Sequence, residues 1–459
     1  MPLSSVRHGN GVPKEPVHPL PTGNVSLPTS SSLGGDQRPG AEPLGEPAGK
    51  PLSRGEIILL LSATFGAGMA LIVPMAYSLA LRLNELAPDR EDYLGYILGV
   101  GSVFSLFTAP LTGILSDRTR SRFGRRRPFT LAGTVVGLIA IPLLVFAPSI
   151  PILTAGWILS TVGWGTAAGS IGNYQADRLP PQQRGQIAGL TGMTMQVSPV
   201  VGILIAGNVA ADRLLLFLVP AAIGAVLVLL FIILVKEPDS RGTQFDHALS
   251  VGKVFGSFLF KPREHPDFAW NWLGRFVFFL GLSLTTSYST YFYAQRLDIP
   301  VEEVASVLAV ISGIGILSST IGSIVGGWLS DHLGRRRLFV VLGVGVFASG
   351  SVVSAFADSF AILLAGSLLS SLGIAAFLSV SQAIVLDVLP GGSTEAGRYM
   401  AVTSFSQKIP SAVAPLLAPM LLLIGAPADR ANYSALYLIC AVLAVAGGSI
   451  ISTKVKGIQ

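Results

Sequence analysis

Acidic residues, arginines and glycines recur together in two short stretches of the sequence. The first stretch reads GILSDRTRSRFGRRRP and contains Gly113, Asp117, Arg122, Gly124 and Arg125. The second reads GWLSDHLGRRR and contains Gly327, Asp331, Gly334 and Arg335. One further acid follows each stretch, Asp177 and Asp387. Oppositely charged side chains near a loop can form and break ion pairs, and glycines permit close contact between helices.

A second group of polar side chains lies within long apolar stretches. Its members are Trp164, Asn173, Gln175, Gln196, Thr285, Tyr288, Gln407 and Lys408. Because a polar group that faces lipid costs desolvation energy, we expect these side chains to line a solute path. The amides of Gln196 and Gln407 suit a hydroxyl-rich solute, and Lys408 would bind an anionic solute or pair with an acid. Alternatives stay open: Trp164 as a packing residue, the glutamines as partners of kinked backbone, and Lys408 and Arg275 as cations that snorkel to the interface.

The elements that carry these residues are predicted to be transmembrane helices. Hydrophobic residues make up 51% of the 459, charged residues 12%, and the mean hydropathy is +0.64. An ordinary soluble domain carries about 25% charged residues, and a spanning helix needs roughly 20 apolar ones. Twelve spans are expected, at about Glu56–Leu83, Tyr93–Leu115, Pro128–Phe146, Ile152–Tyr174, Gly185–Val209, Leu214–Val235, Phe268–Ala294, Val304–Leu329, Leu338–Phe356, Phe360–Leu386, Tyr399–Ile424 and Tyr433–Thr453.

The distribution of arginine predicts the orientation of the spans. Six arginines follow the second span between residues 118 and 127, and three follow the eighth at 335–337. By the positive-inside rule these loops face the cytoplasm, and an even number of spans then places both termini there. The expected location is the cytoplasmic (inner) membrane. We expect a disordered cytoplasmic tail at 1–50, which is rich in Pro, Gly and Ser, helical bundles at 51–235 and 268–459, and a cytoplasmic linker at 236–267.

The two halves of the chain are similar to each other. Asp117 and Asp331 are 214 positions apart, Gly124 and Gly334 are 210 apart, and so are Asp177 and Asp387. Gln196 and Gln407 follow at an offset of 211. A parallel repeat of six helices predicts an all-α membrane protein with two pseudo-symmetric six-helix bundles and a solute site between them.

The phrase SDRTRSRFGRRRPF, its second copy and the twelve-span pattern resemble the major facilitator superfamily, and within it the glycoside/pentoside/hexuronide cation symporters and the sucrose-transporter relatives. The resemblance implies that Asp117 meets the start of the eleventh helix and Asp331 the start of the fifth. It also implies that Arg122 and Arg125 pair with Asp177, and Arg335 with Asp387. Together these contacts would form an interior latch that holds the outward-open state. As an alternative, the arginines only determine the topology and bind anionic headgroups. The fourth helix departs from the sucrose-transporter pattern, because it contains no arginine.

The expected function is secondary active transport of a small polar solute, such as a sugar or glycoside, by alternating access driven by a proton or sodium gradient. An exporter of hydrophobic or amphipathic compounds and a non-transporting receptor or scaffold are alternatives. No enzyme, cofactor or metal site is expected, because the five histidines lack metal-ligand spacing and Cys440 is the single cysteine. Because the basic residues gather in short loops, nucleic acid is not an expected partner. The expected partners are the solute and the lipid bilayer, and the monomer is expected to be functional.

Overall fold

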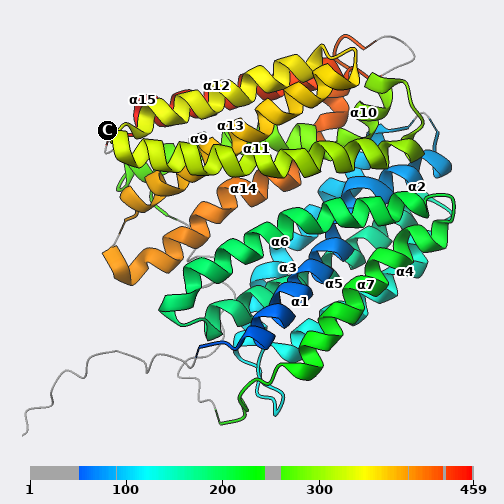
Figure 1. Ribbon diagram of the computed structural model, residues 1–459, viewed down its shortest axis with the longest axis vertical. Coiled ribbons are helices and arrows are strands. Elements are labelled where there is room, and N and C mark those ends of the chain that lie inside the picture. Colours follow the sequence, from blue (N-terminus) through cyan, green and yellow to red (C-terminus); the bar gives the residue numbers. More distant parts are fainter. Residues whose placement is uncertain (1–50, 89, 243–259, 391, 427–430, 457–459) are drawn as a thin grey trace, which may run out of the picture. The chain divides into compact units, whose positions relative to one another are not determined.

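A computed structural model describes residues 51–88, 90–242, 260–390, 392–426 and 431–456, without the side chains of residues 181 and 392–397. The regular structure of these residues is helical (Figure 1). The predicted tail at 1–50 and part of the predicted linker, 243–259, lie outside the described residues. Residues 48–459 form one compact unit.

The first half of the chain contains helices α1 to α7. Their bounds are α1 Arg54–Val73, η1 Pro74–Ser78, α2 Leu79–Leu86, α3 Asp92–Asp117, α4 Arg127–Val145, α5 Ile150–Arg178, α6 Pro181–Asn208 and α7 Arg213–Leu234. Ser53 and Glu56 form a capping box that starts α1. The π-helical turn η1 begins at Pro74, which has no backbone N–H and so interrupts the regular hydrogen-bond ladder between α1 and α2.

The second half of the chain contains helices α9 to α15. Their bounds are α9 Pro266–Ser287, α10 Ser289–Leu297, η2 Val301–Glu303, α11 Val304–Leu333, α12 Arg336–Ala355, α13 Phe360–Asp387, α14 Gly392–Leu422 and α15 Tyr433–Lys454. Tyr288 separates α9 from α10 with a non-helical ψ of 13°. The break in this half therefore falls in the same helix of the repeat as η1 does in the first half.

Helices occupy all twelve predicted positions when α1, η1 and α2 count as one segment and α9 and α10 as another. In the part of the chain that the structure describes, nine helices are long and apolar enough to cross a membrane. The positions outside this group are α5, α9 and α14. Their hydropathy is lower because α5 is rich in Gly, Ser and Thr, and because α9 and α14 contain Arg275 and Lys408.

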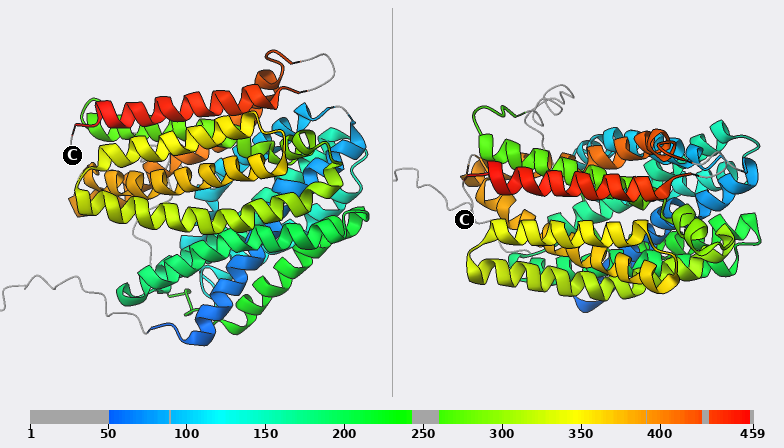
Figure 2. Two further views of the ribbon diagram at one scale, coloured as in Figure 1. Left: turned by 45° about the horizontal axis from the view of Figure 1, so that its top comes forward. Right: turned by 90° about the horizontal axis from the view of Figure 1, so that it is seen from above.

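The same helix pairs pack together in both halves, as the internal repeat predicts. In the first half α1 packs on α7, α4 on α5, and α3 on α5. In the second half the equivalent pairs are α9 with α15, α12 with α13, and α11 with α13 (Figures 1 and 2). The halves meet mainly through α3 with α14 and α6 with α11. This architecture confirms the predicted fold class.

The two ends of the helices differ in the loops they carry. We call the end with the arginine-rich loops, residues 118–126 and 334–335, the hairpin end. The opposite end carries the connections from α2 to α3 and from α10 to α11 and is called the far end. The far-end segments of the two halves lie against each other, since α10 contacts η1 and α2 contacts η2.

Candidate functional site

At the hairpin end of the first half, one arginine binds two carboxylates. The guanidinium of Arg126 donates from Nε to Asp177 at 2.8 Å, from Nη1 to the Ser116 hydroxyl at 3.0 Å, and from Nη2 to Asp117. Arg125 adds an ion pair with Asp177 at 3.0 Å. Burial lowers the pKa of the Arg126 guanidinium, but its bonds to Asp177 and Asp117 outweigh burial and raise it, so the arginine stays charged.

The second half repeats this arrangement with Arg336. Its guanidinium pairs with Asp387 and lies 3.6 Å from Asp331. Arg126 and Arg336 are 210 positions apart, the same offset that relates Asp177 to Asp387. Each hairpin therefore joins the ends of the second and fourth helices of its own half through one arginine.

The structure changes the predicted arginine partners. Arg125 reaches Asp177 as expected, whereas the guanidinium of Arg122 lies over the Phe123 ring at 4.6 Å. The bridging arginines are the next residues along the chain from the predicted Arg125 and Arg335. They stand at the starts of α4 and α12, where their side chains turn back toward both acids.

Glycine is required at the turn of the first hairpin. Gly124 has φ +86°, and its equivalent Gly334 has φ +60°, a conformation that favours glycine. A Cβ on Gly124 would lie 2.0 Å from the Glu237 carboxylate. That carboxylate accepts a hydrogen bond from the Arg126 backbone N–H at 2.9 Å, and burial raises its pKa above the ordinary value. The chain after α7 thus packs on the hairpin.

The other two predicted hairpin glycines, Gly113 and Gly327, have enough space around them for a Cβ atom. A Cβ on Gly113 would be 3.9 Å from Asn173 Nδ2, and one on Gly327 would be 3.7 Å from Ser379 Cβ. Both glycines face the fourth helix of their own half, α5 and α13 respectively.

The aspartates of the predicted latch are exposed at the hairpin end. The side chain of Asp117 is 53% exposed and that of Asp331 is 66% exposed, and each contacts the bridging arginine of its own half. The predicted partner of Asp117 is the start of α14, where the side chains of residues 392–397 are not described. The latch between the halves stays a prediction.

Three of the predicted solute-binding residues are exposed along the helices that join the two halves. Gln196 of α6 accepts a hydrogen bond from the Ser319 hydroxyl of α11 at 3.2 Å, so it lies where the halves meet. Gln407 and Lys408 of α14 are exposed. Gln175 accepts from Thr191 at 3.3 Å between α5 and α6, and Asn173 is half-buried nearby on α5.

Three other candidates are buried in packing contacts. Trp164 is 1% exposed and fills the space beside Gly137, which favours the packing alternative over stacking on a solute. Thr285 is 7% exposed, donates to the Leu282 carbonyl at 3.0 Å and lies near Cys440. Tyr288 is fully buried and joins the halves at the far end, as described below. The positions of these residues within apolar stretches predicted their depth in the membrane, but not whether each side chain faces the solute path or the helix packing.

Arg275 does not snorkel to the interface. It is 5% exposed, and its guanidinium donates to the hydroxyls of Ser381 at 2.6 Å and Ser406 at 3.4 Å. These contacts come from α13 and α14, so the arginine links three helices of the second half through hydroxyl groups.

Hydroxyl groups join the two halves at the far end. Tyr77 donates to the Glu302 carbonyl at 2.6 Å, and Tyr291 donates to the Ala80 carbonyl at 2.8 Å. Further bonds run from Thr290 to the Ala76 carbonyl and from Tyr433 to the Glu91 carboxylate. The sequence analysis missed Tyr77 and Thr290 because backbone acceptors carry no signal in residue type, and it also missed Tyr433, whose acceptor is a carboxylate 342 positions away.

The halves approach each other closely at Gly95 in the first turn of α3. Its N–H donates to the Tyr288 hydroxyl at 3.0 Å, and that hydroxyl donates to the Asp92 carbonyl at 3.1 Å. A Cβ on Gly95 would lie 2.2 Å from the Pro415 carbonyl oxygen of α14. Only glycine fits between α3 and α14 in this arrangement.

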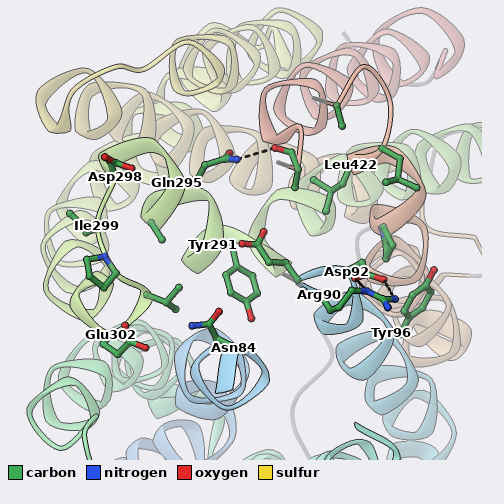
Figure 3. Close-up of a pocket in the computed structure, with 18 of the residues that line it drawn as sticks. Asn84, Arg90, Asp92, Tyr96, Tyr291, Gln295, Asp298, Ile299, Glu302 and Leu422 are labelled. Atoms are coloured by element: carbon green, nitrogen blue, oxygen red, sulfur yellow. Dashed lines mark hydrogen bonds and ion pairs between the residues drawn. The ribbon is translucent and has the colours of Figure 1, made fainter. Parts of the chain in front are cut away.

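A pocket of about 1110 Å³ lies at the far end (Figure 3). It is lined by residues of both halves, among them Asn84, Arg90, Tyr291, Gln295 and Glu302. Tyr291 points into it beside Asn84 in Figure 3, while Arg90 pairs with Asp92 at 2.9 Å. The pocket therefore has both polar and apolar lining residues, and one of them, Tyr291, bonds across to the other half.

The chain thus has two matching halves of apolar helices, with charged hairpins at one end and direct contacts between the halves at the other. A family model described as Major Facilitator Superfamily matches residues 55–320 and 311–455. The chain belongs to the Major Facilitator Superfamily.

Relatives of known name match short stretches of the chain. Solute carrier family 45 member 3 of Mus musculus is 36% identical over 92 residues, 19% of this chain and 16% of that protein. The general alpha-glucoside permease of Schizosaccharomyces pombe is 32% identical over 93 residues, 20% of this chain and 15% of the permease. The sucrose transport protein SUC3 of Arabidopsis thaliana is 32% identical over 100 residues, which is 20% of this chain and 16% of that protein. These matches confirm the predicted resemblance to sucrose-transporter relatives.

Solved structures share the fold at low sequence identity. The nucleoside transporter NupG aligns with a TM-score of 0.68 at 12% identity, covering 86% of this chain and 98% of that one. A D-xylose-proton symporter aligns with a TM-score of 0.67 at 14% identity, covering 89% of this chain and 100% of that one. The likeness establishes the fold of the chain.

Proposed function

We propose that the protein carries a small polar solute, a sugar or glycoside, across the cytoplasmic membrane by cation-coupled alternating access, as a monomer. The hairpin end and both termini face the cytoplasm in this proposal. Residues 51–235 and 268–459 form the two moving halves, and residues 236–267 link them.

The observation that carries the proposal is the closure of the far end by bonds between the halves. Tyr77, Tyr288 and Tyr291 each donate across the boundary, and α3 meets α14 at Gly95. At the hairpin end, Asp117 and Asp331 are exposed and contact arginines of their own halves. This arrangement is the one expected of a carrier that is closed toward the far side.

The solute class rests on the polar residues where the halves meet and on the relatives. Gln196 is exposed and bonded across the boundary to Ser319, and an amide can both donate to and accept from a sugar hydroxyl. Gln407 and Lys408 are exposed on α14. The named alpha-glucoside permease and sucrose transport proteins are relatives of this chain, which supports a glycoside as solute.

The positions of the acidic residues bear on the coupling ion. In the helices that the structure describes, every aspartate and glutamate lies within four residues of a helix end. Coupling through a carboxylate at the midplane is therefore not expected of these helices. A Synechocystis sp. protein named as an uncharacterized symporter is 38% identical over 61 residues, 13% of this chain and 11% of that protein, and its name supports coupled transport.

Uptake by purified protein in proteoliposomes tests the proposal. Radiolabelled sucrose, maltose and glucose are offered with an imposed proton gradient, an imposed sodium gradient, or neither. We expect accumulation of at least one glycoside that requires one of the gradients. A Gln196→Ala variant, compared with the wild type, tests whether Gln196 lies on the solute path. Flux that is absent for all sugars under both gradients would contradict the proposal and favour the scaffold alternative.

A further inference from the structure

The segment that follows each helix break at the far end carries the same sequence motif. Tyr77-x-x-Ala80-x-Arg82-Leu83 recurs as Tyr291-x-x-Ala294-x-Arg296-Leu297, at the offset of 214 that also relates Asp117 to Asp331. We infer that this duplicated motif is the gate of the carrier at the far end, with Tyr77 and Tyr291 as its two positioning residues. The inference rests on the proposed alternating access and names the residues that hold one of its states.

The two tyrosines donate in opposite directions between the halves. Tyr77 belongs to η1 of the first half, and its hydroxyl donates to the Glu302 carbonyl in η2 of the second half at 2.6 Å. Tyr291 belongs to α10 of the second half, and its hydroxyl donates to the Ala80 carbonyl in α2 at 2.8 Å. Both rings are buried, at 0% and 1% exposure. Each half therefore supplies one donor and one acceptor to the closed gate.

The arginine of each motif binds within its own half. Arg82 donates from Nη2 to the Ala147 carbonyl at 2.8 Å, just beyond the end of α4. Arg296 donates from Nη2 to the Ala355 carbonyl, the last residue of α12. Carbonyls at a helix end lack helical partners and carry partial negative charge, so a cation there is favourable. Each gate tyrosine is thus tied to the third helix of its own bundle through an arginine five residues later.

Both motifs begin next to an interruption of their helix. Pro74 opens the π-helical turn η1, and Tyr288 separates α9 from α10. These two positions are themselves 214 apart. Sharp changes of helix direction occur at prolines and π-bulges, where the regular ladder is broken. The gate segments can consequently change their tilt while the remainder of α1 and α9 stays packed on α7 and α15.

Opening of the far end requires both tyrosine bonds to break, because they cross the boundary that must separate. The net contribution of one such bond corresponds to about a two- to ten-fold change in an equilibrium constant. Removal of one hydroxyl should therefore raise the far-open to far-closed ratio by about that factor. Removal of both should multiply the two effects, because the bonds have no shared partner.

Cysteine labelling in membrane vesicles of both orientations tests this inference without a solute. The reporter is Ser319→Cys, half-way along α11 at the boundary with α6, since native Cys440 is fully buried. We expect Tyr77→Phe and Tyr291→Phe to raise the rate of reaction with an impermeant maleimide from the far side and to lower it from the hairpin side. The double variant should show the product of the single effects.

The matched control is Tyr293→Phe. Tyr293 is a buried tyrosine of the same helix, α10, but its hydroxyl faces Ser367 of its own half at 3.5 Å. Its loss should leave labelling from both sides unchanged. An equal rise from both sides would indicate general loosening and would overturn the inference, as would an unchanged double variant. Opposite shifts in labelling without any sugar flux would leave the gate standing and reject the proposed function alone.

Discussion

A single methyl group at Gly95 should move the carrier out of the state that the structure shows. In Gly95→Ala the new Cβ would lie 2.2 Å from the Pro415 carbonyl oxygen and 2.3 Å from the Tyr288 hydroxyl oxygen. Contacts below 3.0 Å are essentially never seen for real Cβ atoms. The tyrosine is the end of a side chain, but Pro415 is backbone, so α3 and α14 must separate.

The size of the effect follows from the cost of overpacking. Extra methyl groups in a well-packed interior cost about 1–3 kcal/mol. The contact exists only while α3 and α14 touch, so this cost falls on the far-closed state. Since 1.4 kcal/mol is tenfold, the far-open to far-closed ratio should rise by about 5- to 150-fold.

Labelling of Ser319→Cys from the far side in Gly95→Ala measures this ratio. The matched control is Gly185→Ala in α6, because a Cβ there meets nothing within 4 Å. Thermal unfolding in detergent checks that the variant is folded. A folded Gly95→Ala protein whose far-side labelling equals that of the control would refute the reasoning, because the helices would then tolerate the methyl group in the closed state.

Four further outcomes are expected. Asp117→Ala should insert normally but transport more slowly because the interior latch loses one carboxylate; unchanged uptake at equal expression would contradict this. Arg126→Lys should lower the thermal unfolding temperature more than Arg125→Lys, because a lysine cannot reach Ser116, Asp117 and Asp177 together, and equal losses would reject Arg126 as the bridging residue. Burial raises the pKa of Glu237 above 4.5, so on acidification the folded protein binds a proton at a higher pH than the unfolded chain does. The free energy of unfolding should therefore rise as the pH falls from about 7 to about 4. Unfolding scans of Glu237→Gln over this range should lack that rise. Gln196→Ala should raise the KM for the transported sugar by about tenfold, the upper range for one hydrogen bond, and a KM equal to wild type would exclude Gln196 from the solute site.

The fold could be predicted because its signals are long and repeated. Twelve apolar stretches, arginine in alternate loops and four matching offsets all point to one architecture, and helix pairs recur in both halves as expected. The acids at the hairpins could also be predicted, since Asp177 and Asp387 follow the glycine turns at the same spacing. In both cases the pattern fixes a position along the chain.

The direction of a side chain is not fixed by such patterns. Arg125 and Arg126 are adjacent and both recur at an offset of 210, so the repeat does not distinguish them. The turn at Gly124 and the start of α4 decide which guanidinium reaches both acids. For Trp164, the sequence predicted the depth in the membrane, whereas the direction of its ring is decided by the space beside Gly137, into which the ring packs. A search for tyrosines at the 214 offset would have found Tyr77 and Tyr291.

The acceptors at the far end have a consequence for variation in this protein. Tyr77, Tyr288, Thr290 and Tyr291 all donate to main-chain oxygens. Any residue type can supply such an oxygen, so the accepting stretches are free to drift in sequence while the donors are not. A random-mutagenesis screen for altered sidedness should therefore recover substitutions at these hydroxyl-bearing residues and at the close contact of Gly95, and few at the exposed Glu302.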